Sequence, residues 1–188
     1  MKKQLLFTIF TCLLFVYGSA QDFKFGAKGG INIASIGGGS SFGVSGIGGL
    51  GSKVSFHIGG VAEVPISEKF AVQPELLYSS QGTKWNFTGG DNLKLDYVNL
   101  PILAKYKIIK GLSAEAGPIV GFLLATNANK EDYNSLDIAF AIGASYKLND
   151  NIFFSLRYNK GITDINKNDT VTIRNQNNVF QISAGYLF

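Results

Sequence analysis

The chain of 188 residues is poor in cysteine, histidine, methionine and charge. It holds one cysteine, one histidine and one methionine. Only 16% of its residues are charged, well below the roughly 25% that is typical of soluble domains. A single cysteine excludes a disulfide framework, and a single histidine leaves little for a metal site, so no cofactor is expected. The hydrophobic fraction of 46% is too high for a disordered chain. The composition therefore favours a membrane protein or a secreted β-rich protein.

The first twenty residues have the three-part layout of a secretory signal peptide. A basic start, Met1–Lys3, precedes the apolar run Leu5–Val16 and the small residues Gly18–Ala20. The apolar run is shorter than the ~20 residues that a spanning helix needs, which disfavours a membrane anchor. We expect residues 1–20 to be removed and residues 21–188 to form one barrel domain.

Removal of this segment also changes the chemistry of the mature chain. Cys12 lies within it, so the mature protein would carry neither a cysteine nor a lipid anchor. The whole chain has 17 basic and 13 acidic residues, and the loss of Lys2 and Lys3 would lower its net charge from +4 to +2. So small an excess of positive charge gives no support to a nucleic-acid partner.

Beyond residue 20 the dominant pattern is period-2 alternation of apolar and polar residues, which is typical of strands with two unlike faces. No apolar run in this part is long enough for a spanning helix. Eight segments alternate in this way, at residues 23–33, 53–66, 70–78, 98–108, 112–122, 136–146, 152–158 and 180–188. Their apolar phase carries no charge. The alternation, the uncharged apolar phase and the even number of segments together predict an all-β, eight-stranded antiparallel up-and-down transmembrane β-barrel.

Aromatic residues and connection lengths support this architecture. Aromatic side chains end many apolar rows, as in the girdles of transmembrane barrels; they are Phe23, Phe70, Tyr78, Tyr106, Phe122, Tyr146, Tyr158, Tyr186 and Phe188. Short connections alternate with long polar links. The short ones are residues 67–69, 109–111 and 148–151, and the long ones are 35–52, 79–97, 126–135 and 161–178. This alternation predicts that the short turns and both mature termini are periplasmic.

Proline and glycine mark two unusual stretches. Pro74, Pro101 and Pro118 fall inside predicted strands, where each removes a ladder donor, and a closed barrel has no edge strand to hold them. We expect β-bulges at these positions. The glycine-rich residues 37–51 are interpreted as a flexible loop rather than a phosphate cradle.

Three motifs closely resemble the PorT-like family, the porin-family outer-membrane β-barrel domain of Gram-negative bacteria. They are Phe25–Asn32, Gln73–Gly82 and Val98–Tyr106. The resemblance covers essentially the whole mature chain and implies a small barrel of the OmpA/OmpX-like type. The family name suggests a porin or secretion role, but its members share a fold rather than a demonstrated activity, so the fold alone does not supply a function.

The polar phase predicts which side chains face the lumen. They are Lys28, Lys53, His57, Glu63, Glu75, Lys105, Glu115, Asp137 and Arg157. Eight strands enclose an interior that side chains can just fill, and buried charges must be paired because desolvation costs several kcal/mol each. Lys105 and Glu115 flank a predicted hairpin and are the expected internal ion pair. The alternative is that lumen water separates them.

Other candidate sites carry weaker signals. His57 near Glu63 and Glu75 could belong to a lipid-deacylating barrel enzyme, but no nucleophile motif surrounds any serine, so a hydrogen-bonded histidine in a polar lumen is favoured and no catalytic residue is assigned. Trp85 and Phe87 are expected among lipid headgroups rather than on a ligand. The loop acids lack calcium-loop spacing; they are Asp91, Glu131, Asp132, Asp164 and Asp169.

The C-terminal Tyr186 and Phe188 resemble the terminal signal that the outer-membrane insertion machinery reads. The leading hypothesis is thus an outer-membrane barrel, not an enzyme, that acts as a structural or interaction protein through its outer loops. Its expected partners are outer-membrane lipid and the insertion machinery, with the loops' partner unidentified. The alternatives are a porin-like transport or secretion component, a lipid-modifying enzyme, and a soluble lipocalin-like barrel. A wide lumen would favour transport, and a contact between His57 and a serine at the rim would favour the enzyme.

Overall fold

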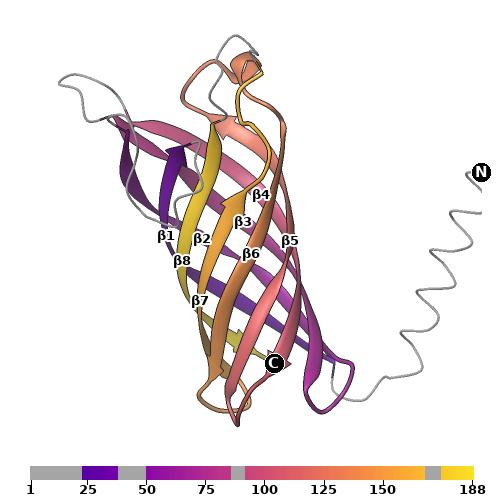
Figure 1. Cartoon of the computed structure of the whole chain (residues 1–188). Helices are drawn as coiled ribbons and strands as arrows, with labels where there is room; N and C mark the ends of the chain where they lie inside the picture. The colour runs from indigo at the N-terminus through magenta and orange to yellow at the C-terminus, as the bar shows by residue number, and fades with distance from the viewer. Residues whose placement is uncertain (1–22, 38–49, 86–91, 168–174) are drawn as a thin grey trace, which may run out of the picture.

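The computed structural model describes residues 23–37, 50–85, 92–167 and 175–188, which form a closed barrel of eight antiparallel strands (Figure 1). Each strand pairs with its sequence neighbours, and β1 closes the barrel against β8. The strands are β1 (Lys24–Gly37), β2 (Leu50–Pro65), β3 (Phe70–Trp85), β4 (Leu93–Lys107), β5 (Leu112–Thr126), β6 (Leu136–Lys147), β7 (Ile152–Gly161) and β8 (Gln176–Leu187). The predicted fold class is confirmed.

Several expectations lie outside the described residues. They concern the signal peptide at residues 1–20, most of the glycine-rich stretch at 37–51, and the side chains of Phe87, Asp91 and Asp169. A short 3-10 helix, η2 (Lys130–Asp132), lies between β5 and β6. In the described ranges no helix is long and apolar enough to cross a membrane.

The strands extend further than predicted at the end of the barrel that carries the long links, which we call the loop end. The opposite end, with the connections at residues 66–69, 108–111 and 148–151, is the turn end. β3 continues to Trp85 and β4 begins at Leu93, within the predicted link 79–97. The prediction was wrong there because Leu93 and Leu95 are apolar yet buried inside the barrel, so the alternation of polar inward and apolar outward residues breaks down.

The barrel is polar inside and apolar outside, the reverse of a soluble protein. Large apolar side chains are exposed along every strand, and they include Phe56, Ile58, Leu76, Ile102, Phe140, Ile142, Leu156 and Ile182. Polar side chains of the opposite phase are buried. This arrangement contradicts a lipocalin-like barrel, which needs an apolar interior, and it is the surface expected of strands that face lipid.

Aromatic side chains form two bands on the outer surface. The turn-end band follows from neighbouring register pairs and contains Phe70, Tyr106, Tyr146, Phe154 and Tyr186. In it, the rings of Phe70 and Tyr106 lie 4.9 Å apart between centroids. Toward the loop end, the rings of Phe56 and Tyr78 lie 5.7 Å apart. Two such bands match the interfacial girdles of transmembrane barrels.

The expected bulges at the prolines are wrong. Strand pairing is interrupted next to each proline. Near Pro74, for example, the β2–β3 pairing stops at Val61–Glu75 and resumes at Val64–Val72. The register is the same on both sides of this interruption and of those near Pro101 and Pro118. The register shifts lie elsewhere, between Ser52 and His57 and at Asp96–Tyr97. Each proline thus removes ladder hydrogen bonds without inserting a residue.

Two isoleucines, one on β4 and one in the turn that follows it, test which side of the barrel wall contacts lipid. Ile102 and Ile109 are 55% and 62% exposed, but Ile102 lies midway between the aromatic bands and Ile109 lies in a turn. Arginine facing the bilayer midplane costs roughly 2–4 kcal/mol, and about 0–1 kcal/mol near the interface. We expect Ile102→Arg to lower the free energy of unfolding in lipid vesicles accordingly and Ile109→Arg to leave it nearly unchanged, as measured by urea titration. Equal effects of the two substitutions would contradict the assigned face.

Candidate functional site

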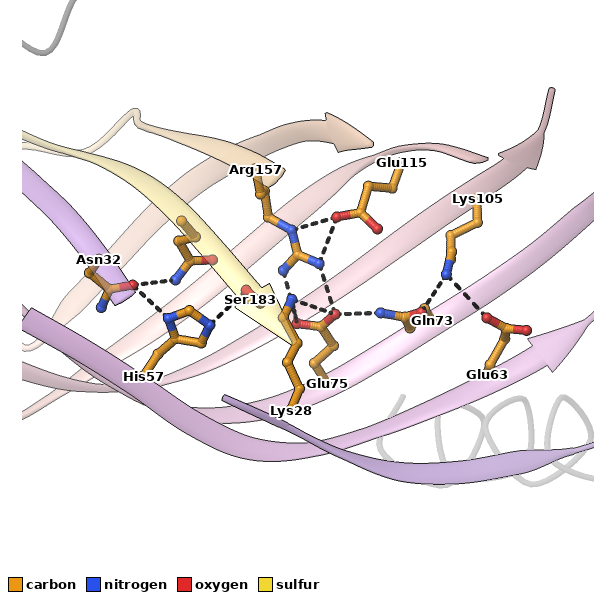
Figure 2. Close-up of polar contacts among 11 residues, drawn as sticks. Lys28, Asn32, His57, Glu63, Gln73, Glu75, Lys105, Glu115, Arg157 and Ser183 are labelled. Carbon is orange, nitrogen blue, oxygen red and sulfur yellow. Dashed lines mark hydrogen bonds and ion pairs between the residues drawn. The ribbon is translucent and has the colours of Figure 1, made fainter. Parts of the chain in front are cut away.

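The barrel interior holds the main concentration of charged and polar side chains, and a buried arginine lies at its centre (Figure 2). Arg157 on β7 binds Glu75 on β3 through two parallel hydrogen bonds, Nη1 to Oε2 and Nη2 to Oε1, each 2.9 Å. Its Nε also donates to Glu115 Oε1 on β5 at 2.9 Å. Lys28 on β1 adds a second cation, with Nζ 3.4 Å from Glu75 Oε1. Two cations and two carboxylates, none more than 1% exposed in its side chain, therefore balance each other in the lumen.

A glutamine links this central group to a second charged group nearer the turn end. Gln73 donates from Nε2 to Glu75 Oε1 at 2.6 Å and accepts at Oε1 from Lys105 Nζ at 2.9 Å. Lys105 also pairs with Glu63 Oε2 at 3.1 Å, and Lys147 bonds the other oxygen of Glu63. The hydrogen-bonded chain therefore runs without a break from Lys147 to Arg157, and it draws residues from β1 to β7.

The expected ion pair between Lys105 and Glu115 is wrong, although the two residues are directly opposed in the β4–β5 register. Lys105 turns instead to Glu63 on β2, and Glu115 binds Arg157 on β7. The reason is the narrow lumen, in which a long side chain can reach across to a non-adjacent strand. A guanidinium also offers Glu115 a better-matched set of donors than an ammonium does.

His57 belongs to a neutral layer on the loop side of the charged groups. Its Nδ1 lies 2.8 Å from Asn32 Oδ1 and its Nε2 lies 2.9 Å from Ser183 Oγ. An amide oxygen can only accept, so Nδ1 carries a proton, and in the neutral imidazole Nε2 then accepts from the serine hydroxyl. Gln181 Nε2 donates to the same Asn32 oxygen at 2.9 Å, and Ser79 Oγ accepts from Asn32 Nδ2 at 3.0 Å. The layer is a hydrogen-bonded set that suits a neutral imidazole, although Gln181 Oε1 has no partner among the described residues.

Ser183, His57 and Asn32 are hydrogen-bonded in the order of a nucleophile, its base and an orienting group. The contact is not at the rim, however. His57 pairs in register with Gly30 in the middle of β1, and all three side chains are buried. Neither the turn-end cavity nor the small cavity beside Asp137, both described below, is lined by any of the three. A substrate has no route to Ser183 through these cavities, so the geometry supports a structural role.

The remaining predicted lumen residues lie toward the loop end. Lys53 is half-buried and donates to the backbone oxygens of Gln81 and Leu93, at 3.0 and 3.4 Å. Asp137 is buried and accepts from Thr163 Oγ at 2.7 Å and from Asn177 Nδ2 at 2.9 Å. The structure thus buries eight of the nine predicted side chains, and Lys53 partly.

An apolar cluster fills the interior at the loop end, and sequence reasoning missed it. Its buried members are Ile36, Leu93, Leu95, Tyr97, Leu123 and Ile165, with Tyr133 packed against them. Ile165 comes from the link between β7 and β8, and Tyr133 from the link between β5 and β6. Asn134 joins these links because its Nδ2 donates to the backbone oxygens of Asp164 and Asn166, both at 2.9 Å. The sequence showed only that the predicted links contain apolar residues. It did not indicate whether their side chains point into the barrel or away from it.

The turn end is more open. A cavity of about 380 Å³ lies there, and its lining includes Lys69, Lys105, Lys107, Lys110 and Lys147 together with Glu63, Glu68 and Asp150. Lys105 and Glu63 belong to the charged chain described above, so this chain bounds the cavity toward the middle of the barrel. Among the residues that the structure describes, no group of three His, Cys, Asp or Glu side chains could hold a metal.

The C-terminal aromatics lie on the outer surface. Tyr186 and Phe188 are exposed, and their ring centroids lie 5.5 Å apart. The backbone N–H of Phe188 donates to the oxygen of Phe25 at 2.7 Å, which ties the C-terminus to β1. Trp85 is the last residue of β3 and pairs in register with Leu50.

Comparisons with known proteins agree with this geometry. Residues 19–167 match the family described as outer membrane protein beta-barrel domain. Neisserial surface protein A is 12% identical with a TM-score of 0.56, over 89% of this chain and 100% of that one. The attachment invasion locus protein Ail of Yersinia pestis is 11% identical with a TM-score of 0.49, over 89% and 100%. The likeness to the neisserial protein shows the fold alone. A comparison with curated proteins finds no match.

Removal of the central arginine tests the charge balance. Arg157→Met leaves Glu75 and Glu115 with only Lys28 between them, and an unpaired buried charge costs about 3–5 kcal/mol. We expect the free energy of unfolding, measured by urea titration in vesicles, to fall by about that amount. Adding Glu115→Gln leaves one cation, Lys28, opposite one carboxylate, Glu75, so the charges in the centre balance again. The double variant should therefore be more stable than Arg157→Met alone. A double variant that is no more stable than the single one would contradict this account.

Proposed function

The chain belongs to the outer membrane protein β-barrel domain family, and from this we propose that it is a sealed outer-membrane scaffold that presents an interaction surface through its outer loops. The coarse part of this statement, a small outer-membrane β-barrel protein, follows from the family and the fold. The interaction role is the proposal. The observation that carries it is that side chains occupy the interior while residues 127–135 and 162–167, from two of the long links, are joined and pack on the apolar cluster at one end.

The filled lumen favours a scaffold over a porin-like transport component. A solute would have to displace the Arg157–Glu75 pair and then the apolar cluster around Ile165 and Tyr97. The first step breaks a fully buried, bidentate ion pair, which is costly. An eight-stranded barrel leaves no second route through its interior, because side chains fill a ring of this size.

The links at the loop end form the proposed interaction surface. Residues 127–135 and 162–167 are joined by Asn134 and by a backbone bridge between Tyr133 and Asn166. Their outer side chains are charged and exposed, and they include Lys130, Glu131, Asp132 and Lys167. Binding surfaces on loops that a rigid scaffold holds in place are common. We propose a protein or glycan partner outside the cell, met through this joined pair of links.

The finer sequence expectations are part of the same proposal. A signal peptide at residues 1–20 and periplasmic turns would place residues 127–135 and 162–167 outside. The motifs Gln73–Gly82 and Val98–Tyr106 support membership of the PorT-like branch, and Tyr186 with Phe188 supports recognition by the insertion machinery. We propose no enzymatic role, because Ser183 lies out of reach of both cavities. Outer-membrane lipid is the partner of the apolar exterior.

Single cysteines at the two ends test the proposed orientation. The mature chain would lack cysteine, so Glu131→Cys in the joined links and Lys110→Cys in a turn each add one thiol at an exposed position. We expect a membrane-impermeant maleimide to label Glu131→Cys on intact cells that produce the protein.

Lys110→Cys is the matched control for this labelling. It should react only after the outer membrane is permeabilised, because we place the turns in the periplasm. Labelling of Lys110→Cys on intact cells, with Glu131→Cys protected, would reverse the orientation and remove the joined links as an external surface.

A further inference from the structure

A small cavity lies inside the barrel beneath the apolar cluster. Its volume is about 10 Å³, and its lining consists of Gln81, Asn99, Ile119, Gly121, Asp137, Ala139, Asn159, Asn177 and Val179. A volume of this kind holds about one water-sized sphere. Polar residues from β3, β4, β6, β7 and β8 meet there, and no member of the charged chain around Arg157 lines the cavity.

Asp137 brings a negative charge to this cavity. Its side-chain oxygens accept from Asn177 Nδ2 and from Thr163 Oγ. Thr163 Oγ already accepts from the backbone N–H of Ile138 at 2.8 Å, so its own proton is available to Asp137. Both carboxylate oxygens thus face hydrogen-bond donors, an arrangement that suits the ionised form.

The charge on Asp137 has no basic partner in the described part of the chain. Glu63, Glu75 and Glu115 are also buried, and each of them pairs with a lysine or an arginine. Asp137 is only 7% exposed, and its partners Thr163 and Asn177 are both neutral. A buried charge without a counter-charge is strongly unfavourable, so this carboxyl group needs either a proton or a bound cation.

Two amides add oxygen atoms around the same space. Asn159 is 5% exposed, and its Oδ1 has no hydrogen-bond partner among the described residues. Buried amide oxygens in folded proteins are nearly always partnered. Asn99 lies across from Gly121, where an added Cβ would be 2.6 Å from Asn99 Oδ1. The glycine therefore makes room for that oxygen at the cavity.

The ligand set selects the kind of ion. Carboxylate and amide oxygens suit hard cations rather than soft ones. Magnesium keeps several waters, for which the cavity has no room. Asp137 is the one carboxylate in the lining, so a monovalent cation balances its charge, whereas a divalent cation such as calcium would leave a buried positive charge. A water molecule would serve Asn159 but leave the charge of Asp137 unbalanced. We propose that the cavity binds one sodium ion, held by Asp137 and by the amide oxygens of Asn99 and Asn159.

Bound sodium would stabilise the loop end of the barrel. Its ligands come from β4, β6 and β7, and Asp137 also holds Thr163, two residues before Ile165 of the apolar cluster. The ion would thus join three strands to the link that covers the interior. Without it, the link would be held less firmly.

Urea unfolding of the full barrel in detergent micelles tests this site. The probes are sodium chloride and choline chloride at equal ionic strength, since choline is too large for the cavity. A ligand at ten times its Kd shifts the ratio of folded to unfolded protein about elevenfold. We expect a shift of that order in sodium chloride relative to choline chloride for the wild-type chain, and none for Asp137→Asn.

Two further variants keep the test independent of folding defects. Gly121→Ala preserves the charge but displaces Asn99 Oδ1, and it should also abolish the sodium effect. Ser155→Ala is the matched control, because Ser155 is buried in the lumen, its Oγ has no partner among the described residues, and it does not line the cavity. We expect Ser155→Ala to retain the full sodium effect.

Crystals soaked in thallium(I) acetate locate the ion directly, because thallium(I) replaces monovalent cations and scatters anomalously. An anomalous peak between Asp137 and Asn159 supports the proposal. Equal stability of the wild-type chain in the two salts, a sodium effect that persists in Asp137→Asn, or an ordered water at this position without an anomalous peak would each overturn it.

Discussion

The bidentate pair between Arg157 and Glu75 is the interaction on which the rest of the interior depends. A guanidinium keeps its proton under all ordinary conditions, so its burial at the centre of the lumen requires carboxylates around it. Glu75 and Glu115 meet that requirement, and Lys28 then balances the second negative charge. These four residues come from β1, β3, β5 and β7, so one cluster of charges connects every second strand of the barrel.

This charge balance determines how the two ends of the barrel differ. Toward the turns, Gln73 extends the network to Lys105 and Glu63, beyond which the cavity of about 380 Å³ begins. Toward the loops, the side chains become neutral at His57, and beyond the cavity beside Asp137 they become apolar at Leu95 and Ile165. The outer surface stays apolar between the two aromatic bands, as a lipid environment requires. The molecule is therefore closed by charge pairing in its middle and by apolar packing at one end.

Much of this architecture can be predicted from alternation alone. The period of two identifies all eight strands and the phase of the buried charges, because each strand separates lipid from a polar lumen. Alternation fails at Leu93 and Leu95, where the pattern is inverted: the apolar side chains lie inside and Lys94 between them is exposed. The bulges expected at Pro74, Pro101 and Pro118 are also absent, because hydrogen bonds are lost there without a change of register. The choice of ion partners was also out of reach. Hairpin geometry considers only adjacent strands, whereas Lys105 reaches from β4 to β2 and Arg157 from β7 to β3.

Single-channel conductance of the purified barrel in a planar bilayer tests the closed interior most directly. The interior that we describe predicts no steady conductance, because an ion would have to break the Arg157–Glu75 pair and pass the apolar cluster around Ile165. Steady conductance of porin size from the monomer would contradict the closed interior and favour a transport role.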